Sequence, residues 1–245
     1  MSIKRVYLCI LFILVFSINS YSAESIYGYE NRDNNIDENS NHTSFNYALK
    51  VGTLGVGVDL STSLNEWMSL RFNANGLRYT TDDESRYNSM ISTDKTYDLQ
   101  TIGLLLDYHL LQLRVTTGIY MNDNLIIDIA TPTSRSGLFF NGVNYDVSSI
   151  TRVEQTISFN KVSPYLGIGW GNNTKKEGWN ISLDIGLMYH GTPSLDLDIT
   201  FNPLLSKAKA DEILKNAEVE KKVQEDDLSD FPFYPVVMVG FSYSF

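Results

Sequence analysis

Cysteine is almost absent from this chain of 245 residues: its single copy, Cys9, lies in a short apolar segment near the amino terminus. Two basic residues precede that segment, which runs from Val6 to Phe16, and small residues follow it. This order is typical of a secretory signal peptide. We therefore expect residues 1–22 to be removed and residues 23–245 to form a mature protein without cysteine, which excludes a disulfide-stabilised secreted domain.

Long hydrophobic runs are absent as well. A helix that crosses a bilayer needs about 20 consecutive apolar residues, and neither the segment from Val6 to Phe16 nor any later segment reaches that length. Helices and closed sheets of strands are the only structures that cross the hydrocarbon core of a membrane. Any insertion of the mature chain into a membrane must therefore use strands.

Positive charge is scarce, with 19 Lys and Arg against 29 Asp and Glu and a formal net charge of −10. Nucleic acid is therefore excluded as an expected partner, because its phosphates attract basic proteins. The three histidines, His42, His109 and His190, lack the spacing of metal ligands, and we expect no metal site and no cofactor. The sequence His190-Gly191-Thr192 differs from the His-x-Ser pattern of barrel enzymes that modify lipid A, so no enzymatic activity is expected.

The carboxy-terminal stretch carries the clearest pattern in the chain. Apolar residues occupy every second position from Phe233 to Phe245, and this period of two predicts a strand with one apolar face. Chain ends fray in water, whereas the last strand of an outer-membrane barrel pairs with the first and faces lipid. We interpret the stretch as such a closing strand rather than as the edge of a soluble sandwich. Phe241, Tyr243 and Phe245 also resemble the signal that the bacterial barrel-assembly machinery recognises.

The same alternation recurs along the chain. It is found in segments 46–61, 67–80, 96–109, 113–121, 157–170 and 179–190, and residues 25–33 are a further candidate. Within 46–61 the phase slips at Gly52-Thr53, which predicts a β-bulge inside one strand. Together with the terminal strand, these segments predict an all-β fold, an eight-stranded antiparallel transmembrane β-barrel with long extracellular loops and one short loop helix.

Connection lengths predict the direction of the strands. Short turns follow residues 61, 109 and 170, and longer connections follow residues 80, 121 and 190. Short connections face the periplasm in outer-membrane barrels. The strand that begins at Asn46 is then expected to run inward, which makes residues 25–33 the outward-running first strand.

Two of the long connections contain local structure. Phe140-Asn141-Gly142-Val143 predicts a small hairpin, and alternation at 195–201 predicts an outward extension of a strand or hairpin arm. Asn202-Pro203 has the composition of a helix cap, and residues 207–224, rich in Ala, Glu and Lys, predict a helix. The sequence leaves open whether this helix is solvated or covers the barrel mouth as a plug or lid.

The opposite phase of the strands gives the side chains expected inside the barrel. Both signs of charge occur among the lumen-lining candidates, which are Lys50, Asp59, Arg71, Asp107, Arg114, Asp184 and His190. Charges in a narrow barrel must pair or meet water, and eight strands leave room only for side chains or a small ligand. We expect these residues either to fill the lumen as a polar network or to line a path for a solute.

Several segments carry a resemblance to a known family. Asp184-Ile185-Gly186-Leu187-Met188-Tyr189-His190-Gly191-Thr192-Pro193 is similar to the penultimate strand of the CarO-type outer-membrane proteins, the carbapenem-resistance-associated or ornithine-uptake porins. The hairpin at 141–145, the helix rich in Ala, Glu and Lys, and residues 235–240 match the same family. Residues 163–169 resemble several small barrels, including the OmpW type. The family often ends on Trp, where this chain has Phe245.

The resemblance implies an eight-stranded barrel in the outer membrane of a Gram-negative cell, associated with passage of ornithine and other basic amino acids. We therefore expect a porin-like channel for small cationic solutes. Acidic stretches at 82–84 and 225–227 would attract such solutes over short range. Outer-membrane lipid, lipopolysaccharide and the barrel-assembly machinery are the other expected partners. The alternative is a non-conducting barrel that serves structure or adhesion through its extracellular loops.

Overall fold

The computed structural model describes residues 45–83, 91–110, 113–132, 137–171 and 178–244, all within a compact unit of residues 42–245. The expected signal peptide 1–22, the candidate strand 25–33 and Phe245 lie outside the described residues, as do the side chains of residues 82–84. Among the described residues, no helix is long and apolar enough to cross a membrane.

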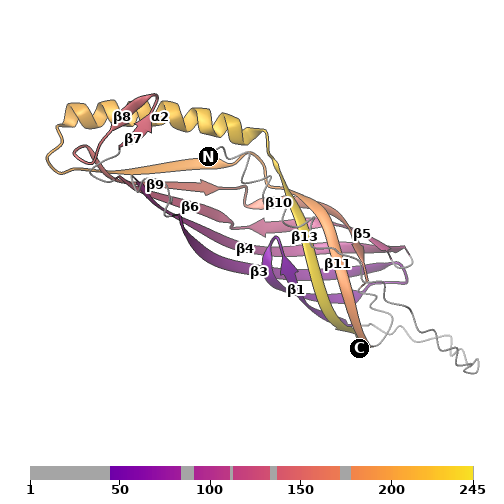
Figure 1. Ribbon diagram of the computed structural model, residues 1–245. Helices are drawn as coiled ribbons and strands as arrows, with labels where there is room; N and C mark the ends of the chain where they lie inside the picture. Colours follow the sequence, from indigo (N-terminus) through magenta and orange to yellow (C-terminus); the bar gives the residue numbers. More distant parts are fainter. Residues whose placement is uncertain (1–44, 84–90, 111–112, 133–136, 172–177, 245) are drawn as a thin grey trace, which may run out of the picture. The chain divides into compact units, whose positions relative to one another are not determined.

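Eight strands close into a ring in which every neighbouring pair is antiparallel (Figure 1). The ring consists of β1 (Phe45–Gly52), β2 (Gly55–Ser63), β3 (Met68–Asp83), β4 (Ile91–Leu110), β5 (Leu113–Asn122), β10 (Val162–Trp170), β11 (Gly178–Tyr189) and β13 (Phe233–Ser244). Strands β1 and β13 close it, with Asn46 opposite Ser244 and Val51 opposite Val239. The predicted all-β fold, an eight-stranded antiparallel barrel, is confirmed.

The first hairpin of the barrel corrects the sequence prediction. Residues 46–61 form two strands, β1 and β2, joined by a tight turn at Thr53 and Leu54, and not one strand with a bulge. Strand β1 starts beside the end of β13 and runs away from it, so its direction is opposite to the one predicted. The ring therefore reaches eight strands without residues 25–33. A two-residue turn and a bulge shift the alternation in the same way, which is why the sequence prediction was wrong.

Side chains alternate strictly between the two faces of the barrel wall. In β10, Leu166 and Ile168 are 62% and 59% exposed on the outer face, whereas Tyr165 of the same strand is 4% exposed on the inner face. The outer face of β11 continues this apolar band with Trp179, Ile181 and Leu187. A continuous exposed apolar band is rare on soluble monomers and is the lipid-facing surface of a membrane barrel.

The sheet of the barrel wall continues beyond the ring at one point. The first half of β4, from Ile91 to Asp98, pairs with β6 (Leu125–Pro132) instead of β5. Strand β6 then pairs with β9 (Ile150–Ser158), and β9 with β12 (Ser194–Phe201) (Figure 1). The alternation at 195–201 is therefore a separate strand at the edge of this extension.

The extension has a hydrophobic core of its own. The predicted small hairpin is present as β7 (Leu138–Phe140) and β8 (Val143–Tyr145), and helix α2 spans Lys207–Ser229. Ile213 and Ala217 of the helix pack with Phe140, Tyr145, Ile150 and Val153, all of them buried. The helix is capped by Ser206, whose side chain accepts a hydrogen bond from the backbone of Lys209, and not by Asn202 as predicted. One face of α2 thus belongs to the core of the extension.

Candidate functional site

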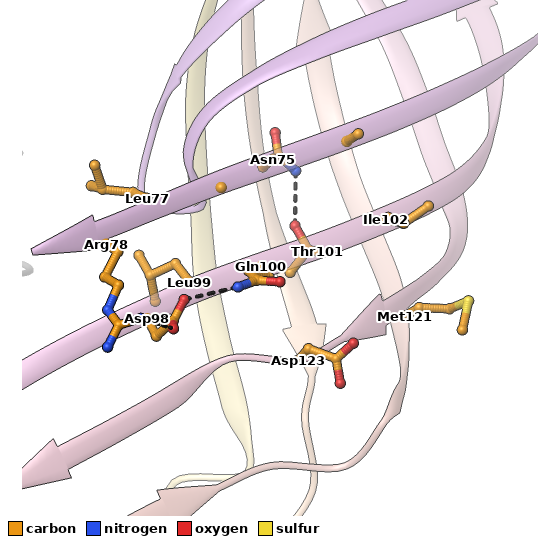
Figure 2. Close-up of a pocket in the computed structure, with 12 residues that line it drawn as sticks. Asn75, Leu77, Arg78, Asp98, Leu99, Gln100, Thr101, Ile102, Met121 and Asp123 are labelled. Atoms are coloured by element: carbon orange, nitrogen blue, oxygen red, sulfur yellow. Dashed lines mark hydrogen bonds and ion pairs between the residues drawn. The ribbon is translucent and has the colours of Figure 1, made fainter.

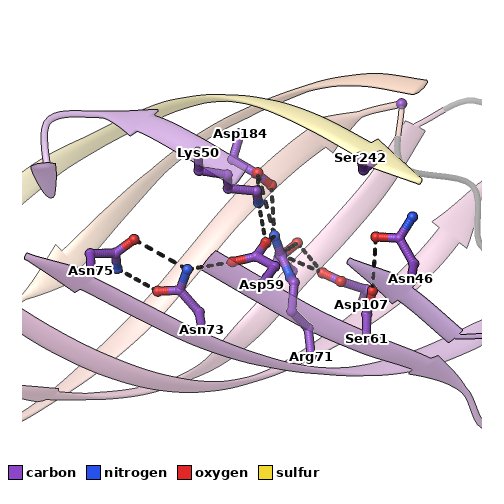
Figure 3. A network of polar contacts seen from close by, with 12 residues as sticks. Asn46, Lys50, Asp59, Ser61, Arg71, Asn73, Asn75, Asp107, Asp184 and Ser242 are labelled. Atoms are coloured by element: carbon purple, nitrogen blue, oxygen red, sulfur yellow. Dashed lines mark hydrogen bonds and ion pairs between the residues drawn. The ribbon is translucent and has the colours of Figure 1, made fainter. Parts of the chain in front are cut away.

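Six strands of the ring each send one charged side chain into the lumen, where these side chains contact one another. Figure 3 labels all of them except Arg114. They are Lys50 of β1, Asp59 of β2, Arg71 of β3, Asp107 of β4, Arg114 of β5 and Asp184 of β11. We call these six residues the charged layer. All six are at most 3% exposed, because inward positions of a narrow barrel are covered by the opposite wall.

Lys50 and Arg71 bridge the carboxylates of the charged layer. The Nζ atom of Lys50 lies 2.5 Å from the Oδ2 atoms of both Asp59 and Asp184. The guanidinium of Arg71 lies 3.1 Å from Asp59, 2.9 Å from Asp107 and 3.4 Å from Asp184. Each cation therefore contacts more than one acid.

Arg114 closes the other side of the layer. Its guanidinium pairs with Asp184 and lies 3.6 Å from Asp107, and it donates a hydrogen bond of 2.7 Å to the carbonyl oxygen of Gly171. Gly169 makes room for this side chain, since a Cβ atom there would come within 2.6 Å of the guanidinium. A side chain at this position would displace the guanidinium of Arg114 from its present place.

Neutral side chains satisfy the remaining acceptors. The hydroxyl of Thr116 donates to Asp107 at 2.5 Å, and the amide of Asn73 donates to Asp59. Asn75 donates to the side-chain oxygens of Asn73, at 2.5 Å, and of Thr101, at 2.9 Å. Buried charges are tolerated when they are paired, and the three cations balance the three acids of the layer. The Nε atoms of Arg71 and Arg114 are buried without a hydrogen-bond partner among the described residues.

An apolar layer fills the lumen next to the charged layer, toward the end of the barrel where β11 stops and β13 starts. It consists of Leu54, Leu105, Tyr120, Tyr165, Met188, Val236 and Met238. The rings of Tyr120 and Tyr165 meet edge to face with their centroids 5.4 Å apart. Met188 is fully buried. Side chains thus occupy the lumen at two successive levels.

No family model matches the sequence, and no curated protein matches it either. Solved structures do match. The crystal structure of Acinetobacter baumannii CarO2 superposes with a TM-score of 0.57 at 18% identity, covering 83% of this chain and 99% of that one. A crystal structure of CarO from the same organism gives 0.53 at 20% identity, with coverages of 82% and 97%. The chain has the fold of the CarO-type outer-membrane barrels.

His190 lies apart from the charged layer of the barrel, although the sequence groups it with the lumen-lining candidates. It follows the end of β11 and is 1% exposed, with its ring 4.7 Å from that of Phe159 and 6.4 Å from that of Tyr234. Neither ring nitrogen has a hydrogen-bond partner among the described residues. Its backbone bonds to Pro232 and Asn160, so His190 ties together the connections at this end of the barrel.

The aromatic residues of the closing strand lie on the outer face. Phe241 stacks on Trp179 of β11 with ring centroids 4.8 Å apart, and Tyr243 meets the same indole edge to face at 5.0 Å. Amphipathic rings of this kind favour the interface between lipid and water. Phe245, the last residue of the expected assembly signal, lies outside the described residues.

The inward phase of the strands also includes Tyr120 and Tyr165 of the apolar layer, but sequence analysis did not single out Thr116 or the aliphatic members of that layer. Thr116 could have been found, because it shares the phase of Arg114 and Tyr120 in β5. Leu105 shares the phase of Asp107, but its hydropathy gives no signal, because it stands within Leu104-Leu105-Leu106. Within the described residues, no group of three His, Cys, Asp or Glu side chains is placed to hold a metal ion.

Proposed function

We propose that the protein is an outer-membrane channel, closed at rest, that passes small cationic solutes such as ornithine and other basic amino acids. The observation that carries the proposal is the position of Lys50, whose ammonium group lies between the carboxylates of Asp59 and Asp184 inside the lumen. The fold shared with the CarO structures supports the assignment to the outer membrane.

The chemistry of the charged layer matches this class of solute. Ornithine and lysine end in the same primary ammonium group as Lys50, and arginine ends in the guanidinium of Arg71 and Arg114. A basic amino acid that enters the lumen can replace Lys50 at Asp59 and Asp184 without leaving either carboxylate unpaired. A neutral sugar offers no cation to these acids, and an anionic amino acid brings two carboxylates with its single ammonium group, so that one buried negative charge is left unpaired, which is costly.

Passage requires that side chains move, because the lumen is packed at rest. The long, flexible stem of Lys50 allows its ammonium group to leave the two carboxylates while the backbone of β1 stays in the sheet. The apolar layer must also open, and Met188 and Met238 within it have unbranched side chains that adapt their shape readily. We therefore expect slow, selective passage rather than a permanently open pore.

A second function is favoured by the same packing. A lumen filled at two levels is also what a non-conducting barrel requires, and the extension of β6, β9, β12 and α2 offers a folded outer surface with its own core. In that case the protein acts through this surface, as a structural or adhesive barrel.

Uptake into liposomes distinguishes the two functions. The purified protein would be reconstituted, and the uptake of ornithine and arginine compared with that of glutamate and a neutral sugar. The channel predicts uptake of the two basic amino acids well above that of the other solutes. Uptake no faster than in empty liposomes for all four solutes would leave the non-conducting barrel as the function.

A further inference from the structure

The outer wall of the barrel is hollowed where β4 changes its partner from β5 to β6 (Figure 2). The hollow has a volume of about 550 Å³. The residues lining it that matter here are Ala74, Gly76, Arg78, Asp98, Ile102 and Met121.

Alternation places this groove on the outside of the barrel. Asn75 and Thr101 also line the hollow, but their side chains point into the lumen, where they are 8% and 3% exposed and bonded to each other. Gly76 and Ile102, their neighbours in sequence, therefore face outward. Met121 is 61% exposed and Ile102 48% exposed, so the floor of the groove continues the apolar outer band.

Gly76 creates the depth of the groove. A Cβ atom built at this residue would meet nothing nearer than the carbonyl oxygen of Leu99, at 3.6 Å, which is an ordinary contact. The backbone of Gly76 is not in the left-handed region, so the strand itself does not require glycine here. The space above Gly76 is thus a feature of the outer surface and is not imposed by the fold.

The end of the groove toward the extension is charged. The side chain of Arg78 is 70% exposed and makes a single long contact of 3.7 Å with Asp98. Asp98 also accepts a hydrogen bond of 3.0 Å from Gln100, and the nearby Asp123 pairs with Lys161. Arg78 is thus the counter-ion of Asp98, but because it is 70% exposed and this contact is long, most donors of its guanidinium remain turned to the surroundings of the barrel.

We propose that this groove binds a phosphorylated, multiply acylated lipid of the outer leaflet. An acyl chain lies over Gly76 against Ile102 and Met121, and a phosphate group accepts hydrogen bonds from Arg78. The positions of the apolar floor and of the exposed guanidinium fit such a lipid. Its acyl chain would lie on the side of the apolar band, and its head group on the side of the extension. The site rests on the outer-membrane assignment proposed above and is independent of whether the lumen conducts.

Native mass spectrometry of the full-length protein in detergent tests the site, with bis-phosphorylated lipid A as the probe. Lipid A without phosphates and phosphatidylethanolamine serve as comparisons. The variants are Arg78→Ala, which removes the guanidinium, and Gly76→Leu, which fills the groove. The matched control is Arg152→Ala, since Arg152 is also exposed and paired, with Glu154 of β9 in the extension.

The proposal expects Arg78→Ala to weaken retention of bis-phosphorylated lipid A by about tenfold, as when one charge-assisted contact is lost, with little effect on the dephosphorylated lipid. Gly76→Leu should weaken both, and Arg152→Ala neither. Equal effects of Arg78→Ala and Arg152→Ala would overturn the site, as would displacement of lipid A by inorganic phosphate alone, which would indicate a simple anion site. Fractionation of cells tests the outer-membrane location separately, so the two failures are distinguishable.

Discussion

The ammonium group of Lys50 lies 2.5 Å from Asp184, although 134 positions separate the two residues along the chain. Lys50 is in β1 and Asp184 is in β11, and both strands pair with the closing strand β13. The contact therefore exists only when the first and last strands of the barrel have met. The charged layer is therefore complete only in the closed ring.

Asp184 is expected to be the most sensitive member of the charged layer, because it alone contacts all three cations. Asp184→Asn leaves those cations short of one buried partner, and we expect the free energy of unfolding to fall by about 3–5 kcal/mol. Urea unfolding in lipid vesicles measures this. Asp98→Asn on the outer surface is the control, with a change of about 0–1 kcal/mol. Equal losses in the two variants would contradict the importance of the layer.

The turn between β1 and β2 gives a second prediction. A Cβ atom at Gly52 would lie 1.9 Å from the backbone oxygen of Val237, whereas Gly76 in β3 has room for one. Gly52→Val should therefore prevent closure of β1 on β13, and Gly76→Val should leave the barrel intact. The shift in gel mobility between heated and unheated samples reports closure. A normal shift for Gly52→Val would show that the two strands do not meet as described.

Some strands of the barrel could be predicted from the sequence, and others could not. The strict alternation in β10 and β11 fixes both faces of each strand. The first hairpin was not predicted, because Thr53-Leu54 lacks the Asn-Gly or Asp-Gly pair that usually identifies a two-residue turn. Without that signature, a shift of phase does not show whether the chain continues in the same direction after a bulge or reverses at a turn.

The candidate site could also be predicted from the sequence only in part. The inward phase identifies the charged side chains of Lys50 and Asp184, since each stands between apolar neighbours in its strand. Which acid meets which cation depends on the stagger of strands around the ring, and no local pattern encodes it. The extension was missed for a related reason: β4 pairs with β5 along one half and with β6 along the other, and both halves have strand-like sequence.

The core of the extension predicts a local effect. Ile213 of α2 is fully buried among Phe140, Tyr145 and Val153. Ile213→Ala should destabilise the packing of the helix by about 2–5 kcal/mol while the charged layer stays intact. Limited proteolysis is the measurement, with faster cleavage within 207–229 and no change in barrel mobility on gels. Loss of the barrel itself would show that the extension is not an independent core.

The aromatic end of β13 gives a prediction about assembly. Deletion of Phe245 should lower the amount of protein in the outer membrane, because the residue completes the signal expected with Phe241 and Tyr243. Ser244→Ala, which keeps the terminal aromatic residue, is the control. Immunoblots of membrane fractions measure both. Unchanged levels after the deletion would remove the proposed interaction with the barrel-assembly machinery.

The most direct test of the proposed function is the rate of ornithine uptake by liposomes that contain Lys50→Met, relative to wild type. The substitution removes the ammonium group that occupies Asp59 and Asp184, and both acids keep contacts with Arg71. We expect faster uptake of ornithine and no gain for glutamate, because the vacated carboxylates then receive the ammonium group of the solute. No uptake in either protein, with the barrel folded, would contradict a cation path through the lumen.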